Sequence, residues 1–426
     1  MQKSSMSKLA KTRISLKVGA FLAYRDIIHA NKWTTGLIIF VMTLTFLNLI
    51  VVSGILVGLI QGSEEANKIH YTSDIIISPF SDRSYIDQSS EIINIIKTIP
   101  GFVAYTGRYT QGGKIESNYK ETLKPNQIIS SAGGLVAGID PVNEDKVTGL
   151  GSLVVEGEYL EPGDTDSILI GGDLLFKYTP IDSPGFQTLK NVEVGSKVRL
   201  NIAGNSREVI VKGIIKGKVG EVDSRIFMLD TEIRKLIGRS DLNLDEIVIK
   251  LADPKMADEF KAALVASGVA ENARIQTWQE AQPKFLKDIK LTFALIGNII
   301  GSIGLAVASI TIFIVIFVNA ITRRRFIGIL KGIGISGQAI QFSYVMQSLF
   351  YSMAGVGFGV LIVFLLLKPL IAAHPIDFPF SDGILVATIS GTLVRAIILF
   401  VATIIAGYIP ARIVIKQNTL DAILGR

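Results

Sequence analysis

The sequence predicts a multi-pass α-helical membrane protein with four transmembrane helices and a large mixed α/β extracytoplasmic domain between the first and second spans. Three observations favour this fold class. The chain is 49% hydrophobic and only 19% charged, whereas soluble domains carry about 25% charged residues. Four long stretches are almost free of charge, and several of the segments beside them are strongly basic. This pattern is typical of a chain that is partly solvated by lipid.

Four stretches are long enough to cross a bilayer. Residues 36–60 contain no charge over 25 positions, a length of roughly 37 Å as a helix, against a hydrocarbon core of about 30 Å. The others are 291–321, 345–367 and 383–411, of which the last is interrupted only by Arg395. A buried helix in a soluble core rarely needs such length, and no small-residue cleavage site of a signal peptide follows the first run. We therefore expect four spanning helices.

These runs predict the boundaries of the segments along the chain. We expect a cytoplasmic amphipathic segment at 1–33, a first transmembrane helix at 34–60, an extracytoplasmic α/β domain at 61–285, a stalk and second helix at 286–322, a cytoplasmic coupling loop at 323–340, a third helix at 341–367, a short external loop at 368–383, a fourth helix at 384–410 and a cytoplasmic tail at 411–426.

Basic residues near the spans predict the orientation. Residues 1–33 carry seven Lys and Arg against one acid, and 323–331 carry four basic residues and no acid. The tail 411–426 adds three basic residues against one acid, while 368–382 carries one Lys and two Asp. Loops rich in Lys and Arg stay in the cytoplasm. We therefore expect a protein of the cell (inner) membrane with both termini in the cytoplasm.

The long segment 61–290 then lies outside the cell membrane. It holds 27 basic and 33 acidic residues, a net charge of −6, although the whole chain is at +6. The positive charge of the chain therefore belongs to the cytoplasmic flanks and reports topology and contact with membrane lipid. It does not indicate a nucleic-acid partner.

The external segment has the patterns of an ordinary α/β domain. We predict a strand at 73–78, a short helix at 90–98 and a hairpin of strands 198–202 and 208–215 around a turn at 203–206. Asp253-Pro254 predicts the start of a helix that runs to about Ala266 and ends at Gly268.

The residues that common enzymes need are missing from the sequence. There is no Gly-x-x-x-x-Gly-Lys-[Ser/Thr] phosphate loop, no His-Glu-x-x-His pair and no cysteine, and three scattered histidines do not suggest a metal cluster. The external carboxylates are spread out, as on a solvated acidic surface. We therefore predict no catalytic residue, no metal and no cofactor, and a chain that is not an enzyme by itself.

Small residues recur within two of the spans. The second span contains Gly297 and Gly301, and the third contains Gly355 and Gly359. Glycines four positions apart let two helix backbones approach closely. The sequence leaves open whether these faces pack within one chain or form a dimer seam.

Two further segments near the membrane have alternative interpretations. Arg395 is expected near the middle of the fourth span, where a charge costs at least about 2.5 kcal/mol on insertion. Its side chain either extends toward the headgroups or faces a partner helix or a polar cavity. Residues 20–33 mix apolar and charged side chains, and they either lie along the inner membrane surface or form a plain cytoplasmic lead-in.

The segment 322–336 is the most specific in the chain. It reads TRRRFIGILKGIGIS, which resembles the signature of MacB/FtsX-type ABC transporter permeases, with Gln347 similar to the LolC/LolE-like branch. The stretches 22–27, 136–141 and 156–160 also resemble recurring family segments. So does the C-terminal pair of motifs, Pro-Ala-Arg at 410–412 and Asn-Thr-Leu-Asp-Ala-Ile at 418–423. The resemblance covers nearly the whole chain in order.

The resemblance implies a permease subunit whose ATP hydrolysis takes place in a separate ABC ATP-binding subunit. The permease pairs as a homodimer, or as a heterodimer with a related permease, for export or extraction of a lipoprotein, lipid, peptide or drug. A periplasmic adaptor or a lipoprotein is a further partner that the family allows. Motion of the first two spans would reach the external domain through stiff helices. The implied ATPase-coupling residues are Arg325, Phe326, Ile327, Gly328, Leu330, Lys331 and Gly334.

One position departs from the family pattern. Phe326 stands where the family often has Glu, so an apolar contact would replace an ion pair with the ATPase. Two other functions stay open on the sequence: an FtsX-like transmembrane regulator of a cell-wall hydrolase, and a membrane receptor that does not transport. The external segment is about twice the length that we expect for FtsX itself, which favours the transporter.

Overall fold

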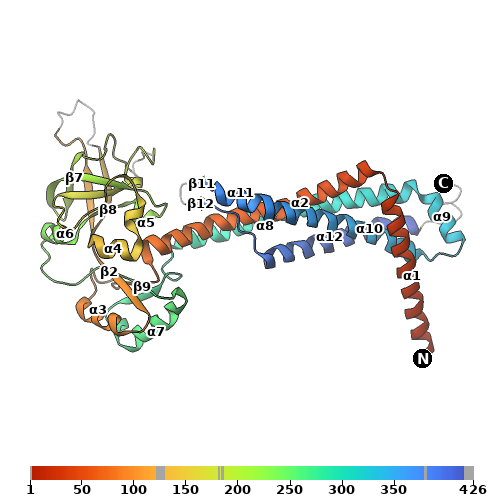
Figure 1. Cartoon of the computed structure of the whole chain (residues 1–426), viewed down its shortest axis with the longest axis horizontal. Helices are drawn as coiled ribbons and strands as arrows, with labels where there is room; N and C mark the ends of the chain where they lie inside the picture. Colours follow the sequence, from red (N-terminus) through yellow and green to blue (C-terminus); the bar gives the residue numbers. More distant parts are fainter. Residues whose placement is uncertain (1, 121–129, 181–182, 184–186, 379–380, 417–426) are drawn as a thin grey trace. The chain divides into compact units, whose positions relative to one another are not determined.

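The computed structural model of the chain describes residues 2–120, 130–180, 183, 187–378 and 381–416 (Figure 1). It divides into two compact units. The helical unit comprises Met1–Leu59, Asp288–Ile376 and Gly383–Arg426. The α/β unit comprises Ile60–Lys287 and Asp377–Asp382.

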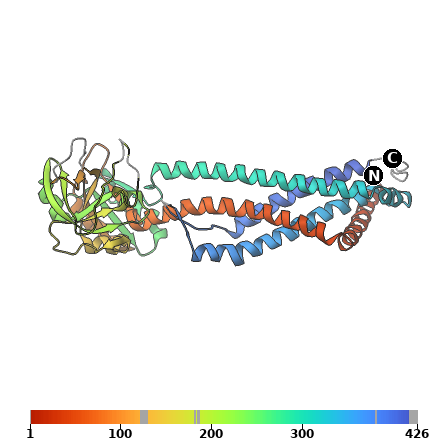
Figure 2. The same ribbon diagram turned by 90° about the horizontal axis from the view of Figure 1, so that it is seen from above.

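Long helices make up the helical unit and run alongside one another in both views (Figures 1 and 2). The four predicted spans are confirmed as helices that are long and apolar enough to cross a membrane. Their ends are set by local signals, since Ser336 and Thr388 each accept a hydrogen bond from a backbone N–H in the first turn of the helix that follows. The helices are α1 (Gln2–Ile28), α2 (Lys32–Asn67), α8 (Lys284–Thr322), α9 (Arg324–Gly332), α10 (Gly337–Leu361), η6 (Ile362–Leu367), α11 (Lys368–Ala373) and α12 (Ile389–Ile415).

Two segments predicted as loops contain regular structure. Residues 323–340 are largely helical, because α9 and the start of α10 lie within them. Residues 368–383 contain α11 and a two-stranded ribbon of β11 (Ile376–Phe378) and β12 (Ser381–Gly383). Both segments contain apolar side chains beyond the predicted ends of the spans. Their backbones form regular hydrogen bonds, within helices in the first segment and within a helix and a ribbon in the second.

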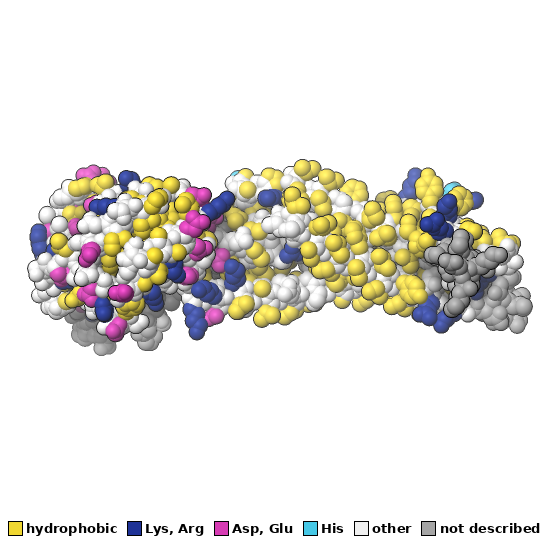
Figure 3. Space-filling model, turned by 90° about the horizontal axis from the view of Figure 1, so that it is seen from below, with side chains coloured by type: hydrophobic (Ala, Val, Ile, Leu, Met, Phe, Trp, Pro, Cys, Tyr) yellow, Lys and Arg dark blue, Asp and Glu magenta, His cyan; other side chains and the backbone are white. Residues whose placement is uncertain are grey.

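Helix α2 lies at the centre of the helical unit. Met42, Phe46 and Ile50 on α2 are fully buried against side chains of α8, α10 and α12. By contrast, large apolar side chains stay exposed along the outer faces, as on α8 at Leu291, Ile303 and others. Figure 3 shows hydrophobic side chains predominating along the helices on the visible face. An exposed apolar surface of this extent requires an apolar solvent, as a lipid bilayer provides.

The α/β unit is built on a mixed sheet whose order is β10-β1-β9-β2-β3-β8-β5-β7-β4, with β6 paired to β2 and β7. Strand β2 is the longest, and it pairs with β9 through its first half and with β3 and β6 through its second half. The strands are β1 (Ile75–Ser78), β2 (Phe102–Glu116), β3 (Ser131–Ile139), β4 (Val154–Gly157), β5 (Ser167–Gly171), β6 (Lys197–Ile202), β7 (Asn205–Ile215), β8 (Arg225–Leu229), β9 (Glu246–Leu251) and β10 (Arg274–Thr277).

Short helices cover this sheet and enclose an aliphatic core of Ile, Val and Leu. They are α3 (Ser89–Thr98), α4 (Pro141–Thr148), α5 (Gly220–Asp223), α6 (Asp230–Ile237) and α7 (Ala257–Ala266), with the single turns η1 (Lys68–Thr72), η2 (Leu150–Leu153), η3 (Gly172–Leu174), η4 (Pro254–Met256) and η5 (Val269–Glu271).

Local predictions in this unit agree with the structure except at one turn. The strand at 73–78 and the helix at 90–98 correspond to β1 and α3. Asp253 accepts a hydrogen bond from the Lys255 N–H at the start of η4, which leads into α7. The hairpin β6–β7 turns through two residues instead of four, because Ala203 and Gly204 both have positive φ (48° and 83°) and Asn205 already pairs with Ile202.

Candidate functional sites

Helix α9 is an amphipathic helix between α8 and α10. Ile327 is 3% exposed and faces the core of the helical unit, with Gly328 buried beside it. The Lys331 ammonium donates a hydrogen bond to the Ile415 carbonyl at 2.6 Å, which joins α9 to the end of α12. Gly334 has φ of 96°, which allows the turn into α10.

The opposite face of α9 is exposed and apolar. Phe326 is 50% exposed, Ile329 is 52% exposed and Ile333, directly after the helix, is 72% exposed. Positions i, i+3 and i+7 lie on one side of a helix, so these three side chains form a stripe, beside the exposed Arg325. The predicted coupling residues thus form two groups. Ile327, Leu330 and Lys331 are buried or half-buried and fix α9 to the helical unit, whereas Phe326 belongs to the exposed stripe. The sequence analysis missed Ile329 and Ile333, although their spacing from Phe326 was a usable signal.

The N-terminal helix α1 packs on the start of α10, a contact that neither sequence interpretation of residues 20–33 included. A Cβ added at Gly19 would lie 2.6 Å from the Ala339 carbonyl oxygen. The Asp26 carboxylate receives the Arg323 guanidinium at 2.5 Å and the Gln347 amide at 3.1 Å. These groups line a polar cavity of about 180 Å³. Gln347, singled out by its family resemblance, therefore joins α10 to α1, and Arg323 joins α1 to the end of α8.

The predicted helix-packing glycines all face α2 of the same chain. A Cβ at Gly297 would lie 3.8 Å from Ser53 Cα, and one at Gly301 would lie 3.3 Å from a Leu49 methyl group. On α10, a Cβ at Gly355 would lie 2.4 Å from Met42 Cβ, and one at Gly359 equally close to the Phe46 ring. The structure therefore places both glycine faces against α2.

A further glycine pair on α2 escaped the sequence analysis, although Gly54 and Gly58 have the same spacing. The extended residues that precede α12 cross α2 at these two glycines. Val386 donates a backbone hydrogen bond to the Gly54 carbonyl at 3.1 Å. A Cβ at Gly58 would lie 1.9 Å from the Ile384 carbonyl oxygen. Only glycine permits this approach.

Arg395 lies closer to the end of its span than we expected from the sequence. Residues 384–388 are extended on α2, so α12 begins only at Ile389 and Arg395 is its seventh residue. The position of Arg395 relative to the middle of the bilayer stays a prediction. Its guanidinium donates a hydrogen bond of 2.5 Å to the Ser53 hydroxyl on α2.

A buried network of charges joins η1, the turn that follows α2, to the sheet of the α/β unit. Arg108 on β2 is 1% exposed and forms ion pairs with Glu144 on α4 at 2.6 Å and with Glu246 on β9 at 3.0 Å. Arg225 on β8 pairs with Glu246 at 2.9 Å. Tyr71 in η1 accepts from Arg108 through its carbonyl and donates to Glu246 through its hydroxyl.

The network is neutral and its charges depend on one another. Burial alone would raise the pKa of Glu246, but Arg225 and Arg108 lower it well below its usual range. Burial alone would lower the pKa of Arg108, but Glu144 and Glu246 raise it. Each charge is therefore held in its ionised form by its partners.

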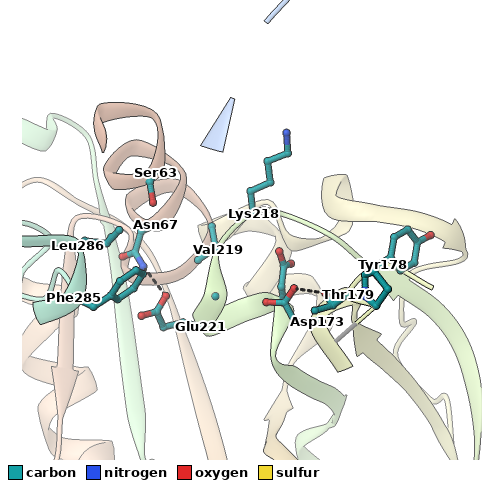
Figure 4. Close-up of a pocket in the computed structure, with 13 residues that line it drawn as sticks. Ser63, Asn67, Asp173, Tyr178, Thr179, Lys218, Val219, Glu221, Phe285 and Leu286 are labelled. Atoms are coloured by element: carbon teal, nitrogen blue, oxygen red, sulfur yellow. Dashed lines mark hydrogen bonds between the residues drawn. The ribbon is translucent and has the colours of Figure 1, made fainter. Parts of the chain in front are cut away.

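A cavity of about 400 Å³ opens beside η1 (Figure 4). Asn67 at the end of α2 and Leu286 at the start of α8 lie on one side of it. Asp173 and Glu221 contribute carboxylates, which accept hydrogen bonds from Thr179 at 3.1 Å and Asn67 at 3.1 Å. The cavity thus connects the ends of both long helices to loops of the sheet. In the parts of the chain that the structure describes, no three His, Asp or Glu side chains gather as a metal ion would require.

Asp223, which also lines this cavity, should make the free energy of unfolding depend on pH. Burial raises its pKa to about 6, against hydrogen bonds from backbone N–H groups that lower it. A carboxyl whose folded-state pKa is raised stabilises fully below its unfolded value and loses that contribution as pH rises through about 6. We expect the free energy of unfolding of the wild type, relative to Asp223→Asn, to fall by about 1 to 3 kcal/mol between about pH 4 and pH 7. Denaturant titrations at several pH values measure this difference.

The matched control is a carboxyl whose shift has the opposite sign. Burial alone would raise the pKa of Asp164, but Lys212 lowers it below its usual value, so the stability that this carboxylate contributes is fully present above about pH 4 and is lost only at lower pH. The free energies of unfolding of the wild type and Asp164→Asn should therefore keep a nearly constant difference between about pH 4 and pH 7. If the free energies of unfolding of the wild type and Asp223→Asn changed equally with pH, the raised pKa could not be assigned to Asp223.

The four apolar helices, their basic flanks and the amphipathic helix α9 define a multi-pass integral membrane protein with one large α/β unit between its first two spans. Residues 298–419 match the family described as FtsX-like permease C-terminal. The chain is 22% identical over 307 residues to the lipoprotein-releasing system transmembrane protein LolC of Neisseria meningitidis serogroup B, covering 67% of this chain and 68% of the relative. It is 25% identical over 281 residues to an uncharacterized ABC transporter permease of Methanocaldococcus jannaschii, covering 64% and 65%.

Two solved structures match about half of the chain. The extracellular domain of the noncanonic ABC-type transporter YknZ from Gram-positive bacteria matches with 14% identity and a TM-score of 0.31, covering 48% of this chain and 98% of that one. The periplasmic region of MacB from Actinobacillus actinomycetemcomitans matches with 13% identity and a TM-score of 0.33, covering 50% and 92%. From the sequence matches, residues 298–419 are similar to an FtsX-like permease domain, and about two thirds of the chain is similar to LolC and to an ABC transporter permease. The motif at 418–423 lies outside the described residues.

Proposed function

We propose that the chain is the membrane subunit of an ABC transporter and couples ATP hydrolysis by a separate subunit to movement of its α/β unit. The observation that carries this proposal is the stripe of Phe326, Ile329 and Ile333 on α9. An apolar stripe at a helix surface next to basic side chains fits a groove on a partner protein. The basic flanks of the spans favour a cytoplasmic position for α9 and both termini, the side on which ATP-binding subunits work.

The anchoring of α9 supports a role in coupling. Its inner face is fixed through Ile327 and Lys331 to the packed helices, and Asp26 joins α1 to Arg323, the residue before α9. A force applied to the stripe therefore acts on α8, α10 and α12 together. Interfaces that are packed in this way move as units instead of deforming locally.

Two helices lead from the helical unit to the α/β unit. Helix α2 has 36 residues, of which 60–67 belong to the α/β unit, and α8 has 39 residues, of which 284–287 belong to it. A continuous helix keeps its backbone hydrogen bonds along its whole length. We propose that these helices carry motion to the buried charge network at η1 and to the cavity at Asn67.

Two copies of the chain, or this chain with a related permease, would complete the transporter with two ATP-binding subunits. The LolC relative is named for lipoprotein release, so extraction of a lipid-modified substrate is the first cargo to test. A regulator of the FtsX type would use α9 in the same way, so the coupling step can be tested before the cargo is known.

Replacing Phe326 and Ile329 together by Asp should reduce copurification of the ATP-binding subunit at least about tenfold, because each buried charge without a partner costs more than 1.4 kcal/mol. Both side chains are exposed, so the fold of the permease should not change. The measurement is the ratio of ATP-binding subunit to permease after affinity purification from the native membrane.

Gln338→Asp is the matched control. It adds a negative charge at an exposed site in the first turn of α10, where the helix dipole favours an acid, and it lies outside the stripe. Its copurification should equal that of the wild type. Undiminished copurification of the Phe326→Asp/Ile329→Asp variant would count against α9 as the coupling helix.

A further inference from the structure

Arg395 is a charged side chain among apolar residues that face outward. On the side of α12 that carries Arg395, Ile398 is exposed and Leu399 is fully buried, and α12 is one of the helices that can cross a membrane. The Arg395 side chain itself is half-buried. A charge at the lipid-facing edge of a spanning helix needs a counter-charge or a route to the headgroups.

The side chains that the structure describes give Arg395 a hydroxyl as partner and no carboxylate. The Ser53 hydroxyl accepts a hydrogen bond from Nη2 at 2.5 Å. A guanidinium has five N–H donors and a full positive charge. One neutral oxygen satisfies one donor and none of the charge. Ser53 also keeps its own O–H as a donor.

The guanidinium lies near the start of its helix. Arg395 is six positions after Ile389, the first residue of α12, a rise of about 9 Å. Helix side chains point toward the N-terminus, and Arg395 follows this rule, since a Cβ at Gly391 would lie 3.0 Å from its Nη1. The Arg395 guanidinium therefore points toward the N-terminal end of α12. At this end residues 384–386 cross α2, and lipid headgroups would lie nearby.

We propose that Arg395 and Ser53 bind the phosphate of a phospholipid in the leaflet at this end of α12. The phosphate diester supplies the negative charge and the acceptor oxygens that the described side chains do not. Arg matches phosphate because its planar fork presents paired N–H donors. The site lies between α2 and α12 and does not involve α9. The lipid proposal and the proposed coupling function can therefore be tested independently.

The test uses the full chain in nanodiscs and a tryptophan reporter beside the site. In a variant with Trp33→Phe and Trp278→Phe, Ile389→Trp places one tryptophan at an 82% exposed position. Its quenching by brominated phosphatidylglycerol is compared with quenching by brominated glycosyl diacylglycerol, which has no phosphate. We expect a preference of about fivefold for the phospholipid, the ratio that corresponds to one arginine near an anionic surface.

Arg395→Gln should reduce this preference to about one, while Arg395→Lys and Ser53→Ala, which keep the charge, should retain most of it. A reporter at Ile413→Trp, near the other end of α12, should not respond to Arg395→Gln. Equal preferences in wild type and Arg395→Gln would overturn the proposal. Loss of the preference in excess inorganic phosphate would overturn the assignment to a lipid, because the site would then take free phosphate.

Discussion

Replacing Arg108 by Met is expected to lower the free energy of unfolding by about 3 to 5 kcal/mol, the cost of breaking a buried ion pair on one side. The substitution keeps an unbranched apolar stem, although methionine is shorter than arginine, and removes the charge that faces Glu144 and Glu246. Glu246 retains Arg225, but Glu144, which is fully buried, retains only hydroxyl partners such as Thr106 and Thr148. A buried carboxylate without a cation is the source of the cost.

The measurement is denaturant unfolding of the purified full chain followed by the fluorescence of Trp278, which lies directly after β10. Arg83→Met is the control, because Arg83 and Asp87 form an exposed pair whose loss should cost less than about 1 kcal/mol. The double variant Arg108→Met/Glu144→Leu should recover much of the lost stability, since a buried pair and an apolar pair of similar size are often equivalent. Equal midpoints for Arg108→Met and Arg83→Met would show that the network contributes no stability.

Replacing Gly355 by Leu is expected to prevent α10 from packing on α2. The new Cβ would lie 2.4 Å from Met42 Cβ and 3.0 Å from the backbone nitrogen of Thr43. A helix backbone cannot move aside as a flexible side chain does, so α10 must shift as a whole. Overpacking of this kind costs about 1 to 3 kcal/mol, and more where the backbone is the obstacle. We expect loss of most of the monodisperse protein at a temperature that the wild type survives, measured by gel filtration after heating.

Gly357→Leu is the matched control on the same helix. Gly357 is two residues away, and a Cβ there meets no atom within 4 Å. The substitution should be neutral or should stabilise the chain by up to about 1 kcal/mol, because leucine favours the helix more than glycine does. If both variants lose the same amount of protein, the close approach of α10 to α2 does not limit stability.

The four spans could be predicted because their signal is local. A helix in lipid must be long and nearly free of charge, and each of these stretches has both properties in a single continuous run. The hairpin β6–β7 and the start of η4 at Asp253, which leads into α7, were predictable for the same reason, since their hydrogen bonds join near neighbours. The family resemblance, carried mainly by 322–336, is confirmed by the matches to FtsX-like, LolC and ABC permease sequences.

The contacts of the candidate sites could not be predicted in this way. Asp26 and Gln347 are separated by 321 positions, and Arg108 and Glu246 by 138. Nothing local in the sequence distinguishes these charges from solvated ones, since their partners are brought together only by the order of the helices and strands. The coupling role of α9 stays a prediction, although the structure shows which of its side chains are exposed.

The sequence by itself determined that this chain has four stretches able to cross a membrane, which loops are basic and which permease sequences it resembles. Length, charge and short motifs carry that information, and they act without reference to distant residues. Only the tertiary structure decided that α2 is the central helix, that the glycines of α8 and α10 face it, and that Arg395 lies near the start of α12 beside Ser53. Such facts depend on which faces of the helices meet, and that is settled by packing over the whole unit.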